Sequence, residues 1–81
     1  MNLQDKYDNA FMEIFSIPKN ALNDTLEYSS IEEWDSVGHM TLIGELEDTF
    51  DIAMEMDDII DFSSYKKGIE LLAKYGVVLN P

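Results

Sequence analysis

Cysteine and arginine are both missing from this chain of 81 residues, and basic side chains are scarce. Without cysteine there is no disulfide framework and no thiolate metal site, which fits a cytoplasmic location. Five lysines stand against seventeen Asp and Glu, giving a formal net charge of -12. Because nucleic acids and anionic membranes are bound through cations that neutralise phosphates, we expect neither as a partner. Basic proteins are the natural partners, unless the acidic side chains serve solubility alone.

Long apolar runs are also missing. No stretch approaches the roughly 20 apolar residues needed to cross a bilayer, and no apolar run of signal-peptide length follows Met1, so we expect no membrane insertion. Apolar residues still make up 46% of the chain, which is enough for a packed core. The length predicts one small domain over residues 1–81, which we expect to be monomeric.

Apolar periodicity predicts an all-α fold, a small bundle of three longer helices plus one short helix, and no strand pattern is visible. The first helix begins at Leu3 and ends near Ser16, because Pro18 bars its continuation. The connection over residues 17–35 carries isolated apolar anchors, and we therefore predict that it is ordered and packs on the core. Within it, a serine and a glutamate three residues apart, Ser30 and Glu33, predict one capped turn.

The other helices follow from the same spacing. The second helix is predicted over residues 36–50, a short one over 56–62 and the last over 65–75, with Gly76 as its left-handed C-terminal residue. On the first helix, polar residues including Asp8 occupy the face opposite the apolar one. The predicted apolar stripe of the second helix is Val37, Met40, Ile43, Leu46 and Phe50, with Leu42 beside it. The short helix is predicted to bury Ile59, Ile60 and Phe62.

The start of the second helix contains the strongest candidate site. Asp35 is the predicted N-cap, and Ser36 in the first turn would present its hydroxyl to solvent beside unpaired backbone N–H groups. A phosphate on this hydroxyl would lie at the positive end of the helix dipole. Since a serine after aspartate at a helix start is in itself an ordinary capping element, the surrounding residues have to decide between the two roles.

Those residues resemble the modification site of acyl carrier proteins. The matching positions are Asp35-Ser36-Val37, Met40, Leu42-Ile43, Leu46-Glu47 and Phe50-Asp51-Ile52, and the resemblance extends from about residue 3 to residue 77. It implies that Ser36 carries a 4′-phosphopantetheine arm, which a phosphopantetheinyl transferase donates from coenzyme A and whose thiol holds acyl intermediates as thioesters. The chain would then be a non-catalytic carrier used by the enzymes of fatty acid or related lipid metabolism.

The resemblance also implies partner and cargo residues. The positions that match the family's docking surface are Asp35, Val37, Met40, Glu47 and Asp48, and the acids among them would face basic patches on the transferase and on acyl-loading and acyl-using enzymes. The positions that match the region where such carriers shelter an acyl chain are Tyr28, Leu46, Met54, Ile59 and Phe62. Packing in the core is the alternative role of these five residues.

Departures from the family pattern bear on the pathway. Gly38 and Thr41 stand where many carriers of fatty acid synthesis have acids, and Gly44 stands where a larger residue is common. These differences favour a specialised lipid or polyketide-type pathway. An aminoacyl or peptidyl carrier shares the arm and the fold, and an acidic adaptor that is never modified is the alternative from a different functional class.

A hydrolase triad and a calcium site have less support from the sequence. Asp35, Ser36 and His39 are neighbours, but an aspartate adjacent to the serine is poorly placed to orient the imidazole of a hydrolase triad. The acids Asp57, Asp58 and Asp61 lack the spacing, the central glycine and the final glutamate of a calcium-binding EF-hand loop. No metal site is therefore expected.

Overall fold

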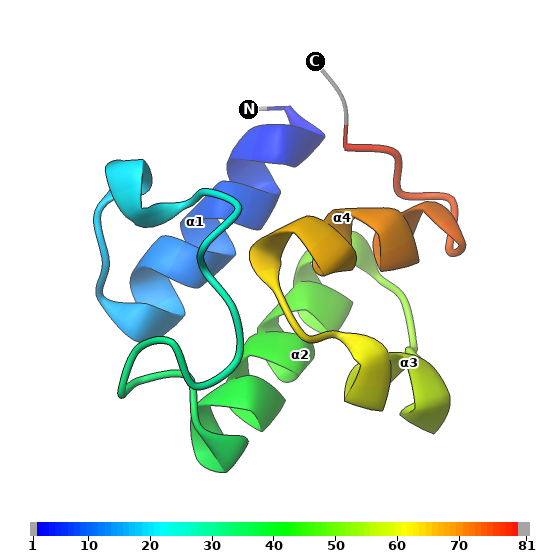
Figure 1. Cartoon of the computed structure of the whole chain (residues 1–81). Coiled ribbons are helices and arrows are strands. Elements are labelled where there is room, and N and C mark those ends of the chain that lie inside the picture. The colour runs from blue at the N-terminus through cyan, green and yellow to red at the C-terminus, as the bar shows by residue number, and fades with distance from the viewer. Residues whose placement is uncertain (1, 80–81) are drawn as a thin grey trace.

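A computed structural model of the chain describes residues 2–79, and this part is helical throughout its regular structure. Its elements are α1 (Leu3–Phe15), a 3₁₀ turn (Lys19–Ala21), α2 (Ser36–Phe50), α3 (Met56–Asp61) and α4 (Tyr65–Ala73). Figure 1 shows the long connection between α1 and α2 wrapping one side of the bundle. The predicted all-α bundle of three longer helices and one short helix is confirmed, and so are both ends of α1 and α2.

Side-chain caps define the helix starts. The carboxylate of Asp35 accepts a hydrogen bond from the backbone N–H of Gly38 at 2.8 Å, as predicted for α2. Asn2 and Ser64 cap α1 and α4 in the same way. Beyond the end of α4, Gly76 has a φ of 83°, the left-handed conformation predicted for it.

The core is built around the ring of Phe11 on α1. This ring lies among aromatic rings of α1, of the connection before α2, of the link between α3 and α4, and of α4, with ring centroids no more than 6.3 Å apart. Its aromatic neighbours are Tyr7, Phe15, Trp34, Phe62 and Tyr65. Offset and edge-to-face aromatic pairs add about 0.5–1.5 kcal/mol each beyond the area that they bury. The aromatic cluster therefore ties the connection and the α3–α4 region to α1.

The buried face of α2 differs from the predicted stripe. Val37 and Met40 are 75% and 54% exposed, whereas the buried residues of this helix are His39, Leu42, Ile43 and Leu46. The true face passes through His39, a polar residue that a search for apolar spacing leaves out. The same correction applies to α3, where Ile60 was predicted to be buried but is 69% exposed.

Asp8 was predicted to lie on the polar face of α1, and this is wrong, since it is buried. Its carboxylate accepts hydrogen bonds from the hydroxyl of Tyr65 at 2.6 Å and from the amide of Gln4 at 3.0 Å. Lys19 lies 3.6 Å away and supplies the opposite charge. Burial and the hydrogen bond to Asp8 raise the pKa of Tyr65 well above its usual value, so this hydroxyl stays a donor. These partners offset the cost of burying the charge of Asp8.

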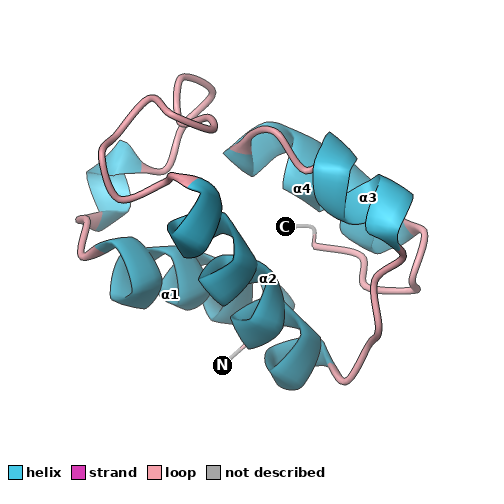
Figure 2. Ribbon diagram, turned by 90° about the horizontal axis from the view of Figure 1, so that it is seen from below, coloured by secondary structure: helices cyan, strands magenta, loops and turns pink. Residues whose placement is uncertain are grey.

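The short helix α3 is held against α4 by a buried acid. The carboxylate of Asp58 accepts a hydrogen bond from the ammonium of Lys74 at 2.6 Å and another from the hydroxyl of Tyr75. Figure 2 shows α3 and α4 lying together across from α1 and α2. Since six residues make too short a helix to persist alone, these contacts fix where α3 lies.

The connection before α2 is ordered by side-chain hydrogen bonds instead of the predicted capped turn. The hydroxyl of Ser30 bonds both the N–H and the carbonyl of Glu27, at 2.9 and 2.6 Å, and does not cap a turn toward Glu33. Leu26 and Trp34 are the anchors that it buries completely or nearly so. None of the helices in residues 2–79 combines the length and the apolar character that crossing a membrane requires.

Candidate functional site

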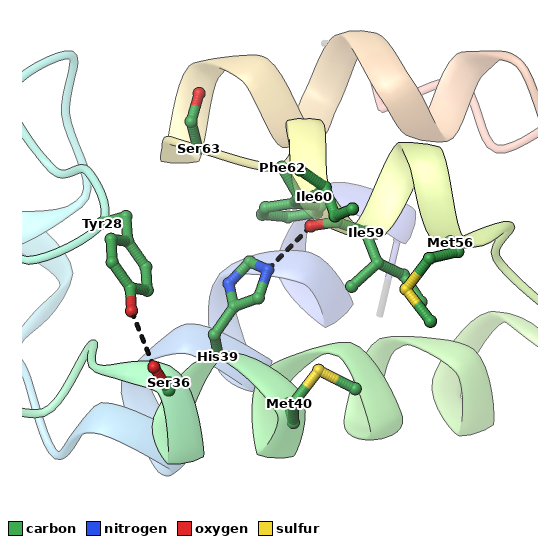
Figure 3. A pocket seen from close by; sticks show the side chains of 9 residues that line it. All are labelled: Tyr28, Ser36, His39, Met40, Met56, Ile59, Ile60, Phe62 and Ser63. Carbon is green, nitrogen blue, oxygen red and sulfur yellow. Dashed lines mark hydrogen bonds between the residues drawn. The ribbon is translucent and has the colours of Figure 1, made fainter.

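Ser36 is the first residue of α2, and its side chain is exposed. Its Oγ lies 3.0 Å from the hydroxyl oxygen of Tyr28, as Figure 3 shows. The carboxylate of Asp35 is occupied by the N–H of Gly38, whereas the N–H groups of Ser36 and Val37 have no partner within the described residues. The hydroxyl thus stands beside free backbone donors at the positive end of a 15-residue helix.

The loop before Ser36 is held by the indole of Trp34, which is fully buried. The indole stacks on the ring of Phe15 with centroids 5.2 Å apart. Close packing at Gly38 places the loop over the first turn of α2, because a Cβ on Gly38 would lie 2.0 Å from the carbonyl oxygen of Glu33. Glycine at position 38 is therefore required by the close approach of this carbonyl. Gly44 on the same helix has no such neighbour, since nothing lies within 4 Å of a Cβ added there.

His39 connects this loop to α3. The indole N–H of Trp34 donates to Nδ1 of His39 at 3.0 Å, and Nε2 of His39 lies 2.8 Å from the carbonyl oxygen of Ile59. Since Nδ1 accepts, the ring proton must be on Nε2, which donates to Ile59. Both ring nitrogens are engaged, and the hydroxyl of Ser36 bonds Tyr28 instead of His39. The arrangement is that of a structural histidine and offers no nucleophile–base contact.

A pocket of about 340 Å³ opens between α2 and α3, with Ser36 at its edge. Figure 3 shows Tyr28 on one side, His39 inside and the α3 residues opposite Met40. No charged residue lines the pocket, and most of its wall is apolar. The lining residues are Tyr28, Ser36, His39, Met40, Met56, Ile59, Ile60, Phe62 and Ser63.

The predicted cargo residues divide into two groups. Tyr28, Ile59 and Phe62 line this pocket. Leu46 and Met54 lie in the core instead, 0% and 7% exposed. Sequence reasoning missed Met56, Ile60 and Ser63 as lining residues and assigned Met40 to docking alone. The signal available for α3 was the run of apolar residues in so short a helix, too many for one buried face.

The predicted docking residues also differ among themselves. Val37, Met40, Asp35 and Asp48 are exposed on or beside α2. Glu47 is half-buried, and its carboxylate accepts a hydrogen bond from the backbone N–H of Met54 at 2.9 Å. This acid therefore ties α2 to the segment that leads into α3.

The acidic side chains of α3 do not form a metal-binding site. Asp58 is paired with Lys74 and Tyr75 as described above. Residues 2–79 hold no group of three or more His, Asp or Glu side chains placed to bind a metal ion.

Comparisons of the chain with known protein families, with curated proteins and with solved structures give no match. The functional interpretation therefore depends on the residues themselves: an exposed serine at a helix start, the buried Trp34–His39 pair that supports it, and the apolar pocket at its side.

Proposed function

We propose that this protein carries acyl groups as thioesters on a 4′-phosphopantetheine arm attached to Ser36. The observation that carries the proposal is the exposed hydroxyl of Ser36, which stands at the first residue of α2 and at the edge of an apolar pocket. The sequence Asp35-Ser36-Val37 and its resemblance to the modification site of acyl carrier proteins support the same role.

The surroundings of Ser36 fit a phosphodiester. The exposed side chain is open to a modifying enzyme, and the N–H groups of Ser36 and Val37 are available to an anion. One carboxylate oxygen of Asp35 is engaged with the backbone N–H of Gly38 in the helix cap. When bound, the arm supplies the thiol that forms the thioester, and the chain supplies attachment, orientation and recognition.

The pocket favours an acyl cargo over an aminoacyl or peptidyl one. Methionine, isoleucine and phenylalanine side chains form most of its wall beside Tyr28 and His39, and the wall contains no charged group for an amine or a carboxylate. Each methylene buried there contributes about 0.8 kcal/mol. Met40 and Met56 face each other across the opening in Figure 3 and are flexible enough to repack around chains of different shape.

Partners would approach along α2. Exposed Val37 and Met40 offer apolar contacts beside Ser36, and Asp48 adds negative charge farther along the helix. With a net charge of -12, the chain attracts a transferase and acyl-loading or acyl-using enzymes that carry basic patches, and this attraction raises the association rate. A cytoplasmic location and a specialised lipid or polyketide-type pathway complete the proposal.

The test is the intact mass of the purified protein before and after incubation with coenzyme A and a broad-specificity phosphopantetheinyl transferase. We expect one added phosphopantetheine on the wild-type chain and none on Ser36→Ala. Ser63→Ala is the matched control, because Ser63 is an exposed serine that lines the same pocket, and it should gain the full mass. An unmodified wild-type chain under conditions that modify a known carrier would refute the proposal.

An acidic adaptor that is never modified is the second candidate. The exposed apolar side chains of Val37, Met40, Met56 and Ile60 on an acidic chain favour it, because such side chains are typical of protein interaction surfaces. Binding of a partner by Ser36→Ala at wild-type affinity, together with no mass gain by the wild-type chain, would select the adaptor.

A further inference from the structure

Tyr28 is the residue outside α2 that contacts the hydroxyl of Ser36, at 3.0 Å between the two oxygens. We propose that Tyr28 is a positioning residue for the modification of Ser36: its hydroxyl donates a hydrogen bond to Oγ during transfer and to the phosphodiester afterwards. The proposal rests on the proposed function, because it assigns a role to Tyr28 in the attachment of the arm.

The ring of Tyr28 is held in place although it is 41% exposed. Its backbone N–H donates to the carbonyl of Ser63 at 2.9 Å, which anchors it to the link between α3 and α4. On the other side, the ring packs edge-on against His39, with centroids 5.7 Å apart and an interplanar angle of 89°. Since His39 is itself fixed by Trp34 and Ile59, the hydroxyl of Tyr28 has a defined position over Ser36.

The turn that follows strengthens this placement. Ser29 has a φ of 70°, and its N–H donates to the carbonyl of Trp34 at 3.0 Å. A left-handed residue other than glycine is uncommon and is held by its surroundings. The chain thus folds back at Ser29, so that Tyr28 and Ser36 meet across a short loop instead of diverging.

The chemistry of the two hydroxyls sets the direction of the hydrogen bond. In the transfer, Oγ of Ser36 attacks the phosphorus of coenzyme A that bears the pantetheine, and the Oγ–P bond forms. The pyrophosphate P–O bond breaks, adenosine 3′,5′-bisphosphate leaves with its electron pair, and the serine proton passes to a base of the transferase. If Tyr28 donates to Oγ, the hydrogen of Ser36 stays free for that base. After transfer Oγ has no hydrogen and can only accept, so Tyr28 has to be the donor.

The charge around Ser36 explains why a neutral donor is needed. Asp35, Glu32 and Glu33 are exposed acids of the same loop, and no lysine lines the pocket. A phosphodiester here receives no compensating cation from the pocket residues. The hydroxyl of Tyr28 and the free N–H groups at the start of α2 are the donors that remain, and hydrogen bonds to an anion are stronger than those between neutral groups.

The experiment compares the wild-type chain, Tyr28→Phe and Thr25→Val as substrates of the transferase, with coenzyme A saturating and mass as the readout. Tyr28→Phe keeps the ring and removes the hydroxyl, and we expect about a tenfold loss of kcat/KM, expressed in kcat with KM unchanged. Thr25→Val also removes one hydroxyl, an exposed one that bonds Asn23 in the connection before α2, and should match the wild-type kinetics. The phosphorus NMR resonance of the phosphodiester should shift in Tyr28→Phe and stay in place in Thr25→Val.

The outcomes separate this inference from the proposed function. A wild-type chain that is never modified overturns both. With a modified wild-type chain, an unchanged kcat/KM for Tyr28→Phe overturns the role in transfer, and a phosphorus resonance identical to the wild-type one overturns the role in the product. A melting temperature of Tyr28→Phe equal to that of the wild-type chain excludes misfolding as the cause of a slower reaction.

Discussion

Replacing Gly38 with alanine tests the close packing that presents Ser36. The added Cβ would lie 2.0 Å from the carbonyl oxygen of Glu33 and 3.3 Å from the ring of Phe15, and Cβ contacts shorter than 3.0 Å essentially never occur in proteins. The clashing atom belongs to the backbone, so a side-chain rotation cannot relieve it. The loop before Ser36 therefore has to move until this contact lengthens from 2.0 Å to at least 3.0 Å.

The expected effect combines two terms of opposite sign. Alanine in place of glycine in a helix interior stabilises by about 1 kcal/mol. Overpacking of a tight contact costs about 1–3 kcal/mol, and we take the upper end because a backbone carbonyl must shift. Gly38→Ala should therefore lose about 2 kcal/mol of unfolding free energy, which corresponds to a melting temperature about 10 °C lower for a domain of this size.

Gly44→Ala is the matched control on the same helix. Nothing lies within 4 Å of its added Cβ, so the helix term acts alone and the variant should gain about 0.5–1 kcal/mol. Urea unfolding followed by far-UV circular dichroism gives both free energies. Trp34 is the only tryptophan of the chain, and its fluorescence should shift to the red in Gly38→Ala because the adjacent Glu33 is displaced. Equal changes in stability for the two variants would refute the reasoning.

Two further predictions concern the supports of α3. His39→Phe keeps a ring of similar size but leaves the buried N–H of Trp34 without its acceptor. Urea unfolding should therefore show a loss of about 1–3 kcal/mol in the free energy of unfolding. A loss below about 0.5 kcal/mol would contradict the role of His39. Hydrogen bonds from Lys74 and Tyr75 lower the pKa of Asp58 in the folded protein. The stability that this contact contributes is therefore complete above the unfolded pKa of about 4, and it is lost as the pH falls through the lower pKa of the folded state. Asp58→Asn should therefore be less stable than the wild-type chain at pH 7, with a gap in urea midpoints that narrows in acid; a gap that persists unchanged at about pH 2 would exclude this linkage.

Much of the fold could be predicted because it depends on local signals. The bounds of α1 and α2, the cap at Asp35 and the left-handed Gly76 follow from apolar spacing and from residue types with strong positional preferences. The errors at Asp8 and along α2 occurred where a polar side chain is buried with partners from distant elements. Asp8 receives a hydrogen bond from Tyr65 and the ring of His39 bonds the carbonyl of Ile59, and neither contact has a signature within one helix.

In the candidate site, too, the local features could be predicted from the sequence and the contacts between distant residues could not. An exposed serine after an N-cap aspartate, at the start of an amphipathic helix, was determined by the sequence alone, because capping and solvent exposure are properties of the first helical turn. The tertiary structure decided which hydroxyl faces Ser36, which face of α2 is buried and which residues of α3 line the pocket. Each of these depends on contacts between residues far apart along the chain, such as His39 with Ile59 and Tyr28 with Ser63, and only packing brings those pairs together.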